Sequence, residues 1–242
     1  MEEENNDNLM AEIRAEEILA IFDSFRKDKS PKPDGWPIEI YLGLYELIGD
    51  DLLKVVEESR KEGFIHAPLN STFISLIPKS HLPGRFEDFK PISLCNCSYK
   101  MISKIISRRL KGILSRHVSK DRFGFLEGRQ IHEAIGVAQE GLHSIKSKKI
   151  RGTIFRIDLS KAYDRVNWLY IRLMLTHMGF HIGFSHWIMS CLTSVSSIVP
   201  INAAASPFFH SERELRQGFP LSPLLFLLVA EGLSRYLKKA NF

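Results

Sequence analysis

The chain has 242 residues, of which 44% are hydrophobic and 25% are charged, as in an ordinary globular protein with a substantial core. Its three cysteines exclude an even disulfide framework and contain no C-x-x-C pair, so we expect reduced thiols and an intracellular protein. The acidic start excludes a signal peptide. The longest apolar run, Leu224 to Ala230, is too short to span a bilayer, and no membrane partner is expected.

Charge is distributed unevenly along the sequence. Residues 1–17 contain seven acids against one arginine, a net charge of −6, whereas the whole chain carries +5. Residues 76–129 contain twelve Lys or Arg and four Asp or Glu, a local net charge of +8. Such a block suits a phosphate backbone, because each neutralised phosphate also releases a counterion. The alternative is a solvated face on an ordinary basic protein.

The N-terminal part is predicted to be mostly helical. Residues 1–8 are expected to form a disordered acidic tail. Apolar residues at helical spacing then predict a helix that ends near Arg26, and a second helix from about Ile38 to Arg60. Between them, three prolines and an Asp-Gly pair in Ser30–Pro37 predict a rigid turn.

A hairpin and a long amphipathic helix are expected next. Residues 72–79 are predicted to form a strand that a loop connects to Pro91–Leu94. The helix from Tyr99 to Leu114 places isoleucines and leucines on one face. Cations occupy another face at spacings i, i+4, i+8 and i+11: Lys100, Lys104, Arg108 and Lys111. This basic stripe either follows a nucleic-acid backbone or serves solubility.

The segment Phe123–Gln130 precedes a further helix, Ile131 to Ile145, with Ile135, Ala138 and Leu142 expected to face inward. Arg129, at the start of this helix, is a candidate phosphate ligand. The alternative is an ion pair with Glu133, four residues later. Polar residues 147–149 follow the helix, and we place a domain boundary there.

The most informative stretch is Phe155–Trp168. Thr153, Phe155 and Ile157 would share one face of a short strand, which puts Asp158 on the opposite face at the strand's C-terminal end. A carboxylate at such an edge can bind a hard cation such as Mg²⁺ without the cost of a buried unpaired charge. The alternative is that Asp158 caps the following turn.

The C-terminal part predicts a helix at 168–178 that stops at Gly179, and a second helix at 185–195. Strands at 198–201 and 208–210 would form a hairpin. The block Leu215–Pro223 is punctuated by prolines and is followed by a helix from Ser222 to Lys239. A proline-punctuated loop before a core helix explains the prolines, but not the order Arg-Gln-Gly at 216–218.

The stretch Phe155–Trp168 closely resembles the first catalytic motif of LINE-type (non-LTR retrotransposon) reverse transcriptases, plant-type elements especially. The block Leu215–Pro223 resembles their arginine-glutamine-glycine-aspartate-proline-leucine-serine-proline motif, and weaker similarities extend across most of the chain. The resemblance implies an α+β, right-hand polymerase fold. Residues 9–150 would form a region like the fingers, residues 151–242 would form an incomplete palm with a small antiparallel sheet, and a thumb is not expected.

The resemblance also implies roles for particular residues. Asp158 and the carbonyl of Leu159 would bind Mg²⁺, and Tyr163 would lie under the incoming sugar and exclude a 2′-hydroxyl. Gln217 and Gly218 would lie against the nascent base pair, where only backbone without a Cβ leaves room for a base. Lys79, Lys90 and Arg129 would contact the triphosphate or the template, although Lys79 alone is better explained as a surface-loop lysine. The implied partners are an RNA template, a DNA primer and deoxynucleoside triphosphates.

The family's other metal-binding carboxylates come from a tyrosine-alanine-aspartate-aspartate hairpin beyond the second block, and no such hairpin occurs in residues 1–242. We therefore expect a polymerase fragment that is inactive alone. The alternative is a retroelement remnant that retains RNA or RNA–DNA binding, and a third hypothesis is an unrelated α/β binding protein. Five residues depart from the family pattern: Lys32, Lys90, Ala203, Glu214 and Phe219.

Overall fold

The computed structural model describes residues 3–26, 33–126, 128–151, 154, 157–202 and 204–240. Lys32 and Ala203, two of the departures from the family pattern, lie outside these residues, as do Thr153 and Phe155 of the expected strand. The helices, in chain order, are α1 (Glu3–Met10), α2 (Ala15–Asp23), α3 (Ile38–Gly43), α4 (Tyr45–Glu62), α5 (Cys97–His117), α6 (Ile131–Ser147), α7 (Trp168–His177), α8 (Ile182–Thr193) and α9 (Ser222–Lys239).

The strands form two small sheets. Strands β1 (Ser71–Pro78) and β2 (Phe89–Cys95) pair antiparallel as predicted, and β3 (Ser196–Ile198) joins β1 in parallel, which gives the order β2-β1-β3. Strands β4 (Pro200–Ile201) and β5 (Ala204–Ala205) form a second antiparallel pair. The fold is therefore α+β, but the sheet of β1 is mixed, because the parallel partner comes from a segment more than 100 residues away in the sequence.

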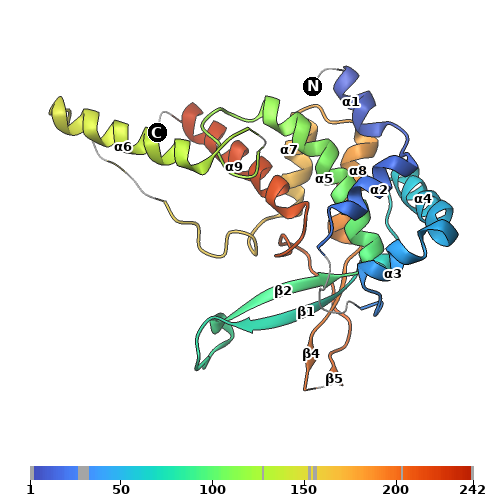
Figure 1. Ribbon diagram of the computed structural model, residues 1–242. Helices are drawn as coiled ribbons and strands as arrows, with labels where there is room; N and C mark the ends of the chain where they lie inside the picture. The colour runs from blue at the N-terminus through green and yellow to red at the C-terminus, as the bar shows by residue number, and fades with distance from the viewer. Residues whose placement is uncertain are drawn as a thin grey trace.

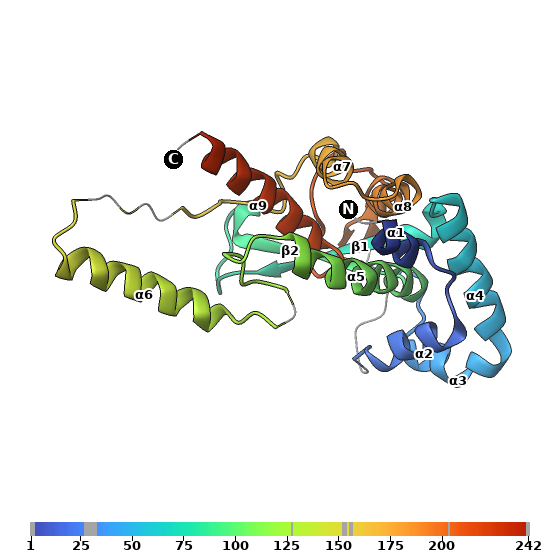
Figure 2. The ribbon, with the colours of Figure 1, turned by 90° about the horizontal axis from the view of Figure 1, so that it is seen from above.

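Figure 1 shows the arrangement of these elements. Most helices gather into one body, from which the long β1–β2 hairpin and the shorter β4–β5 hairpin project. Figure 2, seen from above, shows that α6 stands away from this body, and that the chain returns from it toward α7. Helix α5 lies between the N-terminal helices and α9, and contacts α1, α2 and α9.

The core is built around α5 and α8. The apolar face of α5 is fully buried, as its periodicity predicts, and includes Ile102 and Ile106. From α8, Phe184 and Trp187 pack edge-to-face in the same core, and the Trp187 indole Nε1 donates to Ser59 Oγ of α4 at 3.1 Å. Residues from both ends of the chain thus share one hydrophobic core.

The acidic N-terminus is folded, so the prediction of a disordered tail over residues 1–8 is wrong for residues 3–8, which belong to α1. The Asn6 side chain donates to the Gly179 carbonyl at 3.0 Å and accepts from the His181 amide at 2.8 Å. Arg109 donates to the Leu9 and Ala11 carbonyls. Contacts with distant residues outweigh the low hydrophobicity of this segment.

Helix α6 begins at Ile131 as predicted and ends two residues later than predicted, at Ser147, but it does not have the predicted environment. None of its described residues is buried, and Ile135 and Leu142, which were expected to face inward, are 51% and 44% exposed. The periodicity correctly indicates an amphipathic helix, whereas no neighbouring element covers its apolar face within the described structure.

A buried arginine holds several of these elements together. Arg216, only 6% exposed, donates from Nη1 to Asn70 Oδ1 and to Thr72 Oγ1, both at 2.9 Å. Its Nη2 donates to the Tyr99 hydroxyl and, at 2.9 Å, to the Cys191 carbonyl. Its guanidinium also lies over the ring of Tyr99, and Tyr99 stacks on Phe219. One side chain therefore connects β1, α5, α8 and the loop before α9.

We expect Arg216→Ala to lower the free energy of unfolding by about 3–5 kcal/mol, because several buried acceptors would lose their donor. Urea denaturation measures this loss. The matched control is Arg213→Ala, which removes an exposed arginine three residues earlier and should change stability by less than about 0.5 kcal/mol. Equal effects of the two substitutions would contradict the structural role of Arg216.

Candidate nucleotide-binding site and its nucleic-acid surface

The two sequence blocks meet through main-chain hydrogen bonds. The Leu215 amide donates to the Tyr163 carbonyl at 2.9 Å, and the Glu214 amide donates to the Val166 carbonyl at 3.0 Å. The Gln217 carbonyl in turn accepts from the Ser93 amide of β2 at 3.1 Å. The first block, the second block and the β1–β2 hairpin are therefore fixed to one another by backbone geometry.

A hollow of about 360 Å³ opens where these segments meet. It is lined by four of the residues that the sequence predicted as nucleotide-binding: Lys90, Tyr163, Gln217 and Gly218. Tyr163 is half-buried and stacks on Phe226 of α9, with ring centroids 5.1 Å apart, which fixes the plane of its ring. Burial raises the pKa of the Tyr163 hydroxyl above its ordinary value.

A second hollow, of about 340 Å³, shares Lys90 and Gln217 with the first. Lys79 also lines it, together with two residues that were not assigned a site role from sequence, Lys161 and Asp164. The Lys79 ammonium donates to the Glu87 carbonyl at 2.7 Å within its own hairpin, whereas Lys90 and Lys161 are exposed and form no ion pair within the described residues. The lysines of two distant segments therefore face one space.

Gly218 has φ = +88°, a conformation that residues with a Cβ rarely adopt. A Cβ at this position would meet only Ile92 and Ser93 at ordinary van der Waals distances of 3.7 and 3.8 Å. The backbone conformation of this turn therefore favours glycine at position 218, in addition to the approach of a base that the sequence predicted.

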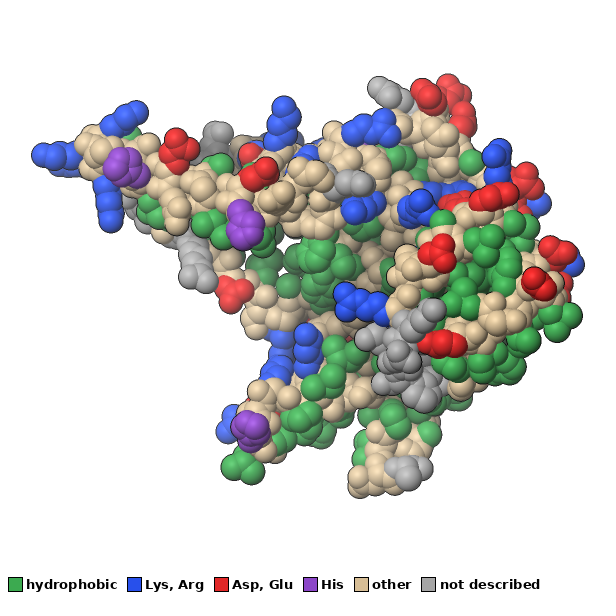
Figure 3. Space-filling model, in the orientation of Figure 1, with side chains coloured by type: hydrophobic (Ala, Val, Ile, Leu, Met, Phe, Trp, Pro, Cys, Tyr) green, Lys and Arg blue, Asp and Glu red, His purple; other side chains and the backbone are tan. Residues whose placement is uncertain are grey.

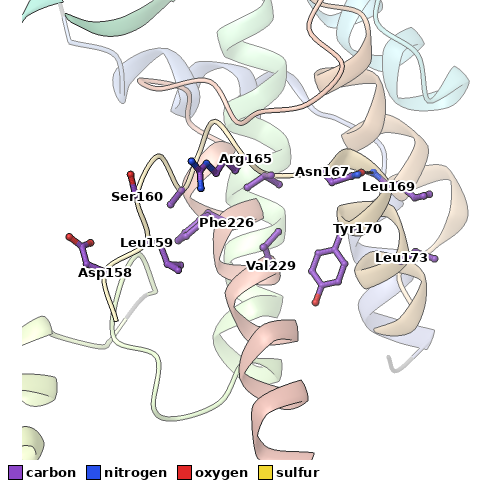
Figure 4. Close-up of a pocket in the computed structure, with 12 residues that line it drawn as sticks. Asp158, Leu159, Ser160, Arg165, Asn167, Leu169, Tyr170, Leu173, Phe226 and Val229 are labelled. Atoms are coloured by element: carbon purple, nitrogen blue, oxygen red, sulfur yellow. Dashed lines mark hydrogen bonds between the residues drawn. The ribbon is translucent and has the colours of Figure 1, made fainter. Parts of the chain in front are cut away.

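Asp158 does not lie in these two hollows. It is exposed and lines a larger, mostly apolar hollow of about 830 Å³ with residues of α7 and α9, among them Tyr170, Leu173 and Phe226. Figure 4 shows Asp158 at one side of this hollow, with its carboxylate pointing away from Phe226 and Val229. The described neighbour Ile157 is 73% exposed and is not in a strand, so the predicted strand edge is not found there.

The residues at Asp158 do not complete a metal site. Among the residues that the structure describes, no set of three His, Cys, Asp or Glu ligand atoms gathers at Asp158; the one such group is Glu58, Glu62 and His66, exposed near the end of α4. Nor does Asp158 cap the following turn in the described chain. The α7 cap is Asn167, whose side chain accepts from the Leu169 amide at 2.8 Å.

Arg129 has a structural role that neither interpretation of the sequence foresaw. Its guanidinium donates to four main-chain carbonyls at the end of α5 and in the following turn, at distances of 2.6–3.2 Å: those of Ser115, Val118, Ser119 and Arg122. The expected partner, Glu133, instead closes a capping box with Gln130. Because its donors are used in this way, Arg129 is not a free phosphate ligand in this structure.

The basic stripe of α5 is only partly available. The Lys104 ammonium donates to the Ser24 carbonyl and hydroxyl at 2.9 and 2.8 Å and lies 3.9 Å from the centre of the Phe25 ring. Burial lowers its pKa, and Lys100 lowers it further by repulsion. Lys104 thus joins α5 to α2, whereas Arg108 is exposed. Figure 3 shows Lys and Arg side chains across the middle of this face and acidic ones gathered over α1–α4.

Comparison with known proteins identifies the family. Residues 77–242 match the family described as reverse transcriptase (RNA-dependent DNA polymerase). The chain belongs to this family.

The similar proteins are a transposon protein and Pol polyproteins of retrotransposable elements, which agrees with the predicted resemblance to LINE-type reverse transcriptases. The chain is 27% identical over 98% of its length to the transposon TX1 149 kDa protein of Xenopus laevis, of which it covers 18%. It is 22% identical over 71% of its length to the Pol polyprotein of the type-1 retrotransposable element R2 of Popillia japonica, covering 24%. It is 27% identical over 66% of its length to the Pol polyprotein of the type-2 retrotransposable element R2DM of Drosophila melanogaster, of which it covers 15%. The chain thus spans less than a quarter of each relative.

Two departures of the second block from the family pattern have different consequences here. Phe219, which stands in place of the acid, is only 3% exposed. The guanidinium carbon of Arg216 lies over the Phe219 ring, 4.4 Å from the ring centre. Glu214, in place of a glycine, has φ = +102°, which is costly for any residue with a Cβ. Its carbonyl accepts from the Trp168 indole at 2.7 Å and its carboxylate accepts from Ser211 Oγ at 2.9 Å.

We expect Glu214→Gly to raise the free energy of unfolding by about 1 kcal/mol, because relief of the backbone strain exceeds the flexibility that glycine adds to the unfolded chain. The control is Glu214→Ala, which keeps the strain and loses the bond from Ser211, and should not stabilise the protein. Thermal or urea unfolding compares the two. A gain for alanine equal to that for glycine would show that the strain at this position is not the cause.

Proposed function

We propose that this chain forms the nucleotide-binding part of a retrotransposon RNA-directed DNA polymerase, which adds deoxynucleotides to the 3′-hydroxyl of a DNA primer on an RNA template. The observation that carries the proposal is the hollow at which Tyr163 and Gln217-Gly218 meet Lys90 of the hairpin. Residues 9–150 would act as fingers and residues 151–242 as part of a palm.

Each residue of the hollow has a chemical role in this proposal. The ring of Tyr163, held in place by its stack on Phe226, would form the floor under the sugar and exclude a 2′-hydroxyl. Gln217 and Gly218 would lie against the base pair. The lysines of the adjoining hollow, Lys79, Lys90 and Lys161, would neutralise the triphosphate, where the attraction of several cations to one polyanion is largest at low salt.

A divalent cation, Mg²⁺ by family expectation, supplies charge neutralisation at the reacting phosphate in polymerases of this kind. Asp158 and the Leu159 carbonyl are the groups of this chain that match the family's metal motif. The described residues do not gather three His, Cys, Asp or Glu ligand atoms at Asp158, so they do not fit a two-metal site by themselves. The remaining ligands would have to come from a segment outside residues 1–242.

The apolar hollow beside Asp158 supports this view. Several apolar side chains around it are largely exposed, including Leu159 at 49%, Leu169 at 62% and Leu173 at 57%. Apolar surface of this extent in one concave place is typical of a surface that another element covers. We propose that the strands of an aspartate-aspartate hairpin pack there and bring their carboxylates to Asp158.

The second candidate function is binding of RNA or an RNA–DNA duplex without catalysis. The strained Glu214 and the incomplete ligand set at Asp158 favour this candidate. Phe219 does not, because its buried stack on Tyr99 makes the substitution an integral part of the core. The two candidates differ in whether Asp158 acts in a reaction.

Primer extension on an RNA template with Mg²⁺ tests the proposal, with this chain joined to a segment that carries the aspartate-aspartate hairpin. We expect DNA synthesis, and a rate about a thousandfold lower for Asp158→Asn, because a unit-charge contact near 4 Å is worth about 4 kcal/mol at an effective dielectric constant of about 20. Asp51→Asn, at an exposed position of α4, is the control. Extension by the 242 residues alone, abolished by Asp158→Ala, would refute the need for further carboxylates.

Selection of the sugar gives a separate prediction for the same joined protein. Tyr163→Ala should allow ribonucleotide incorporation, because the ring that blocks the 2′-hydroxyl is removed. Tyr163→Phe is the matched control, since it keeps the ring and its stack on Phe226 and should keep the discrimination. The ratio of kcat/KM for the two nucleotide types measures the effect. Unchanged discrimination in Tyr163→Ala would remove the proposed role of this residue.

A further inference from the structure

Two apolar helix faces of this molecule are exposed, and they lie at opposite ends of it. Figures 1 and 2 both show α6 at one end and α3 with α4 at the other, with the body of the protein between them. The residues of both faces are exposed, so the described part of the chain covers neither face. Apolar surface that is gathered in this way is typical of a site of association.

The first face lies on α3 and α4. These helices follow one another almost without a break, because the Leu44 amide donates to the Ile40 carbonyl and the Ile48 amide donates to the Leu44 carbonyl, both at 3.0 Å. Ile40, Leu44 and Leu47 therefore recur at spacings i, i+4 and i+7, which places them on one side of the helix. All three are exposed, Leu47 by 78%. We call these three residues the α3–α4 face.

Carboxylates lie around the α3–α4 face. Burial raises the pKa of the Tyr45 hydroxyl, and the charges of Asp50 and Glu16 raise it further, so carboxylates of α4 and α2 lie near the same ring. Neither Asp50 nor Glu46 forms an ion pair with a described residue. Figure 3 shows apolar side chains over α2–α4 with acidic ones around them. This face therefore fits a partner that is apolar and positively charged.

The second face lies on α6. Apolar residues recur along this helix at alternate spacings of four and three, the pattern of a helix that packs lengthwise against another helix: Ile131, Ile135, Ala138, Leu142 and Ile145. Ile131, Ile135 and Leu142 are exposed, and we call these three residues the α6 face. Each of the two acids of α6 comes two residues before a member of this face and so lies on the opposite side of the helix: Glu133 and Glu140.

The C-terminal end of α6 is basic. Four exposed cations occupy the last turn of the helix and the residues that follow it: Lys146, Lys148, Lys149 and Arg151. None of them forms an ion pair within the described part of the chain. The α6 face is therefore apolar and is positively charged at one end, which are the two properties that the α3–α4 face requires of a partner.

We propose that the α6 face of one copy of this chain docks lengthwise on the α3–α4 face of a second copy, with the cations at the end of α6 against Glu46 and Asp50. The 17 residues of α6 extend for about 25 Å, so the whole helix fits alongside the longer run of α3 and α4. Leu142 precedes Lys146 as Leu47 precedes Asp50, so the charges favour helices that run parallel.

A second copy is the occupant that the structure supports, because α6 and the α3–α4 face stand too far apart on one molecule to meet. The two faces differ, so the contact is head-to-tail, and a copy that uses one face keeps the other. Association then continues to longer chains unless a ring closes. The inference goes beyond the proposed function, since the contact involves neither the residues of the nucleotide hollow nor a nucleic acid.

Sedimentation velocity of the 242-residue chain over a wide range of concentrations tests the proposal. We expect the mean mass to rise with concentration. Leu47→Asp and Ile135→Asp should each raise the Kd of association about 30-fold or more, because each puts a charge in the centre of the apolar contact. The matched controls are Val137→Asp, on the other side of α6, and Leu82→Asp, at the tip of the β1–β2 hairpin, which are exposed and should associate as the unmodified chain does.

A mixture of the two interface variants gives the sharpest result. Leu47→Asp keeps an intact α6 face, and Ile135→Asp keeps an intact α3–α4 face. Each should be monomeric alone, whereas their equimolar mixture should form complexes of two copies and nothing larger, because the remaining faces are blocked. Both positions are exposed, so the far-ultraviolet circular dichroism and thermal unfolding of the variants should match those of the unmodified chain.

Charge reversal tests the polar part of the contact. Asp50→Lys and Lys146→Glu should each weaken association about 3- to 10-fold, and the double variant should restore it, since the pair is then reversed. Asp158→Asn should leave association unchanged, so loss of primer extension and loss of association are distinguishable. A chain that is monomeric at every concentration would overturn the proposal. So would association that survives Leu47→Asp, or variants that fail to form the mixed complex.

Discussion

The buried guanidinium of Arg216 is the interaction on which the rest of this structure depends. It satisfies acceptors of β1, α5 and α8 at once and lies against the rings of Tyr99 and Phe219, and no carboxylate of the described residues pairs with it. The charge is stabilised by hydrogen bonds and aromatic faces instead. Burial raises the pKa of the Tyr99 hydroxyl well above its usual range, so this partner of Arg216 remains neutral. Burial also raises the pKa of the nearby Cys191 thiol to about 12, while the main-chain carbonyl of Cys191 accepts the hydrogen bond from Arg216.

The position of Arg216 in the sequence gives this network a functional consequence. Gln217 and Gly218 follow it directly, so the network that fixes the arginine also fixes the backbone of the candidate site. Main-chain bonds from Leu215 to Tyr163 and from Ser93 to Gln217 then add the first block and the hairpin to the same frame. The side chains of the candidate site lie at the surface of this frame, where they can contact a ligand.

The charged residues divide in the same way, between structural ion pairs and the candidate site. Acidic residues concentrate over α1–α4, where Glu57 and Glu17 are paired with Arg60 and Arg109. The hydrogen bond from Arg60 lowers the pKa of Glu57, as expected of a carboxylate in a structural pair. The lysines at the candidate site have fewer partners: Lys90 and Lys161 face hollows and form no ion pair within the described part of the chain. Under the proposed function, these cations would neutralise a polyanionic substrate.

The sequence by itself determined the elements whose signals are local. Helix α9 begins at Ser222 and ends at Lys239 as predicted, and the β1–β2 hairpin and the face of α5 were also expected, because periodicity and proline positions act over a few residues. The tertiary structure alone decided the exposure of α6, the role of Arg129, the place of Asp158 outside the hollow at Tyr163 and Gln217, and the parallel pairing of β1 with β3. Each of these depends on which distant segment lies alongside. Arg216 and Asn70, for example, are 146 residues apart in sequence and 2.9 Å apart in space, and no local pattern encodes such a contact.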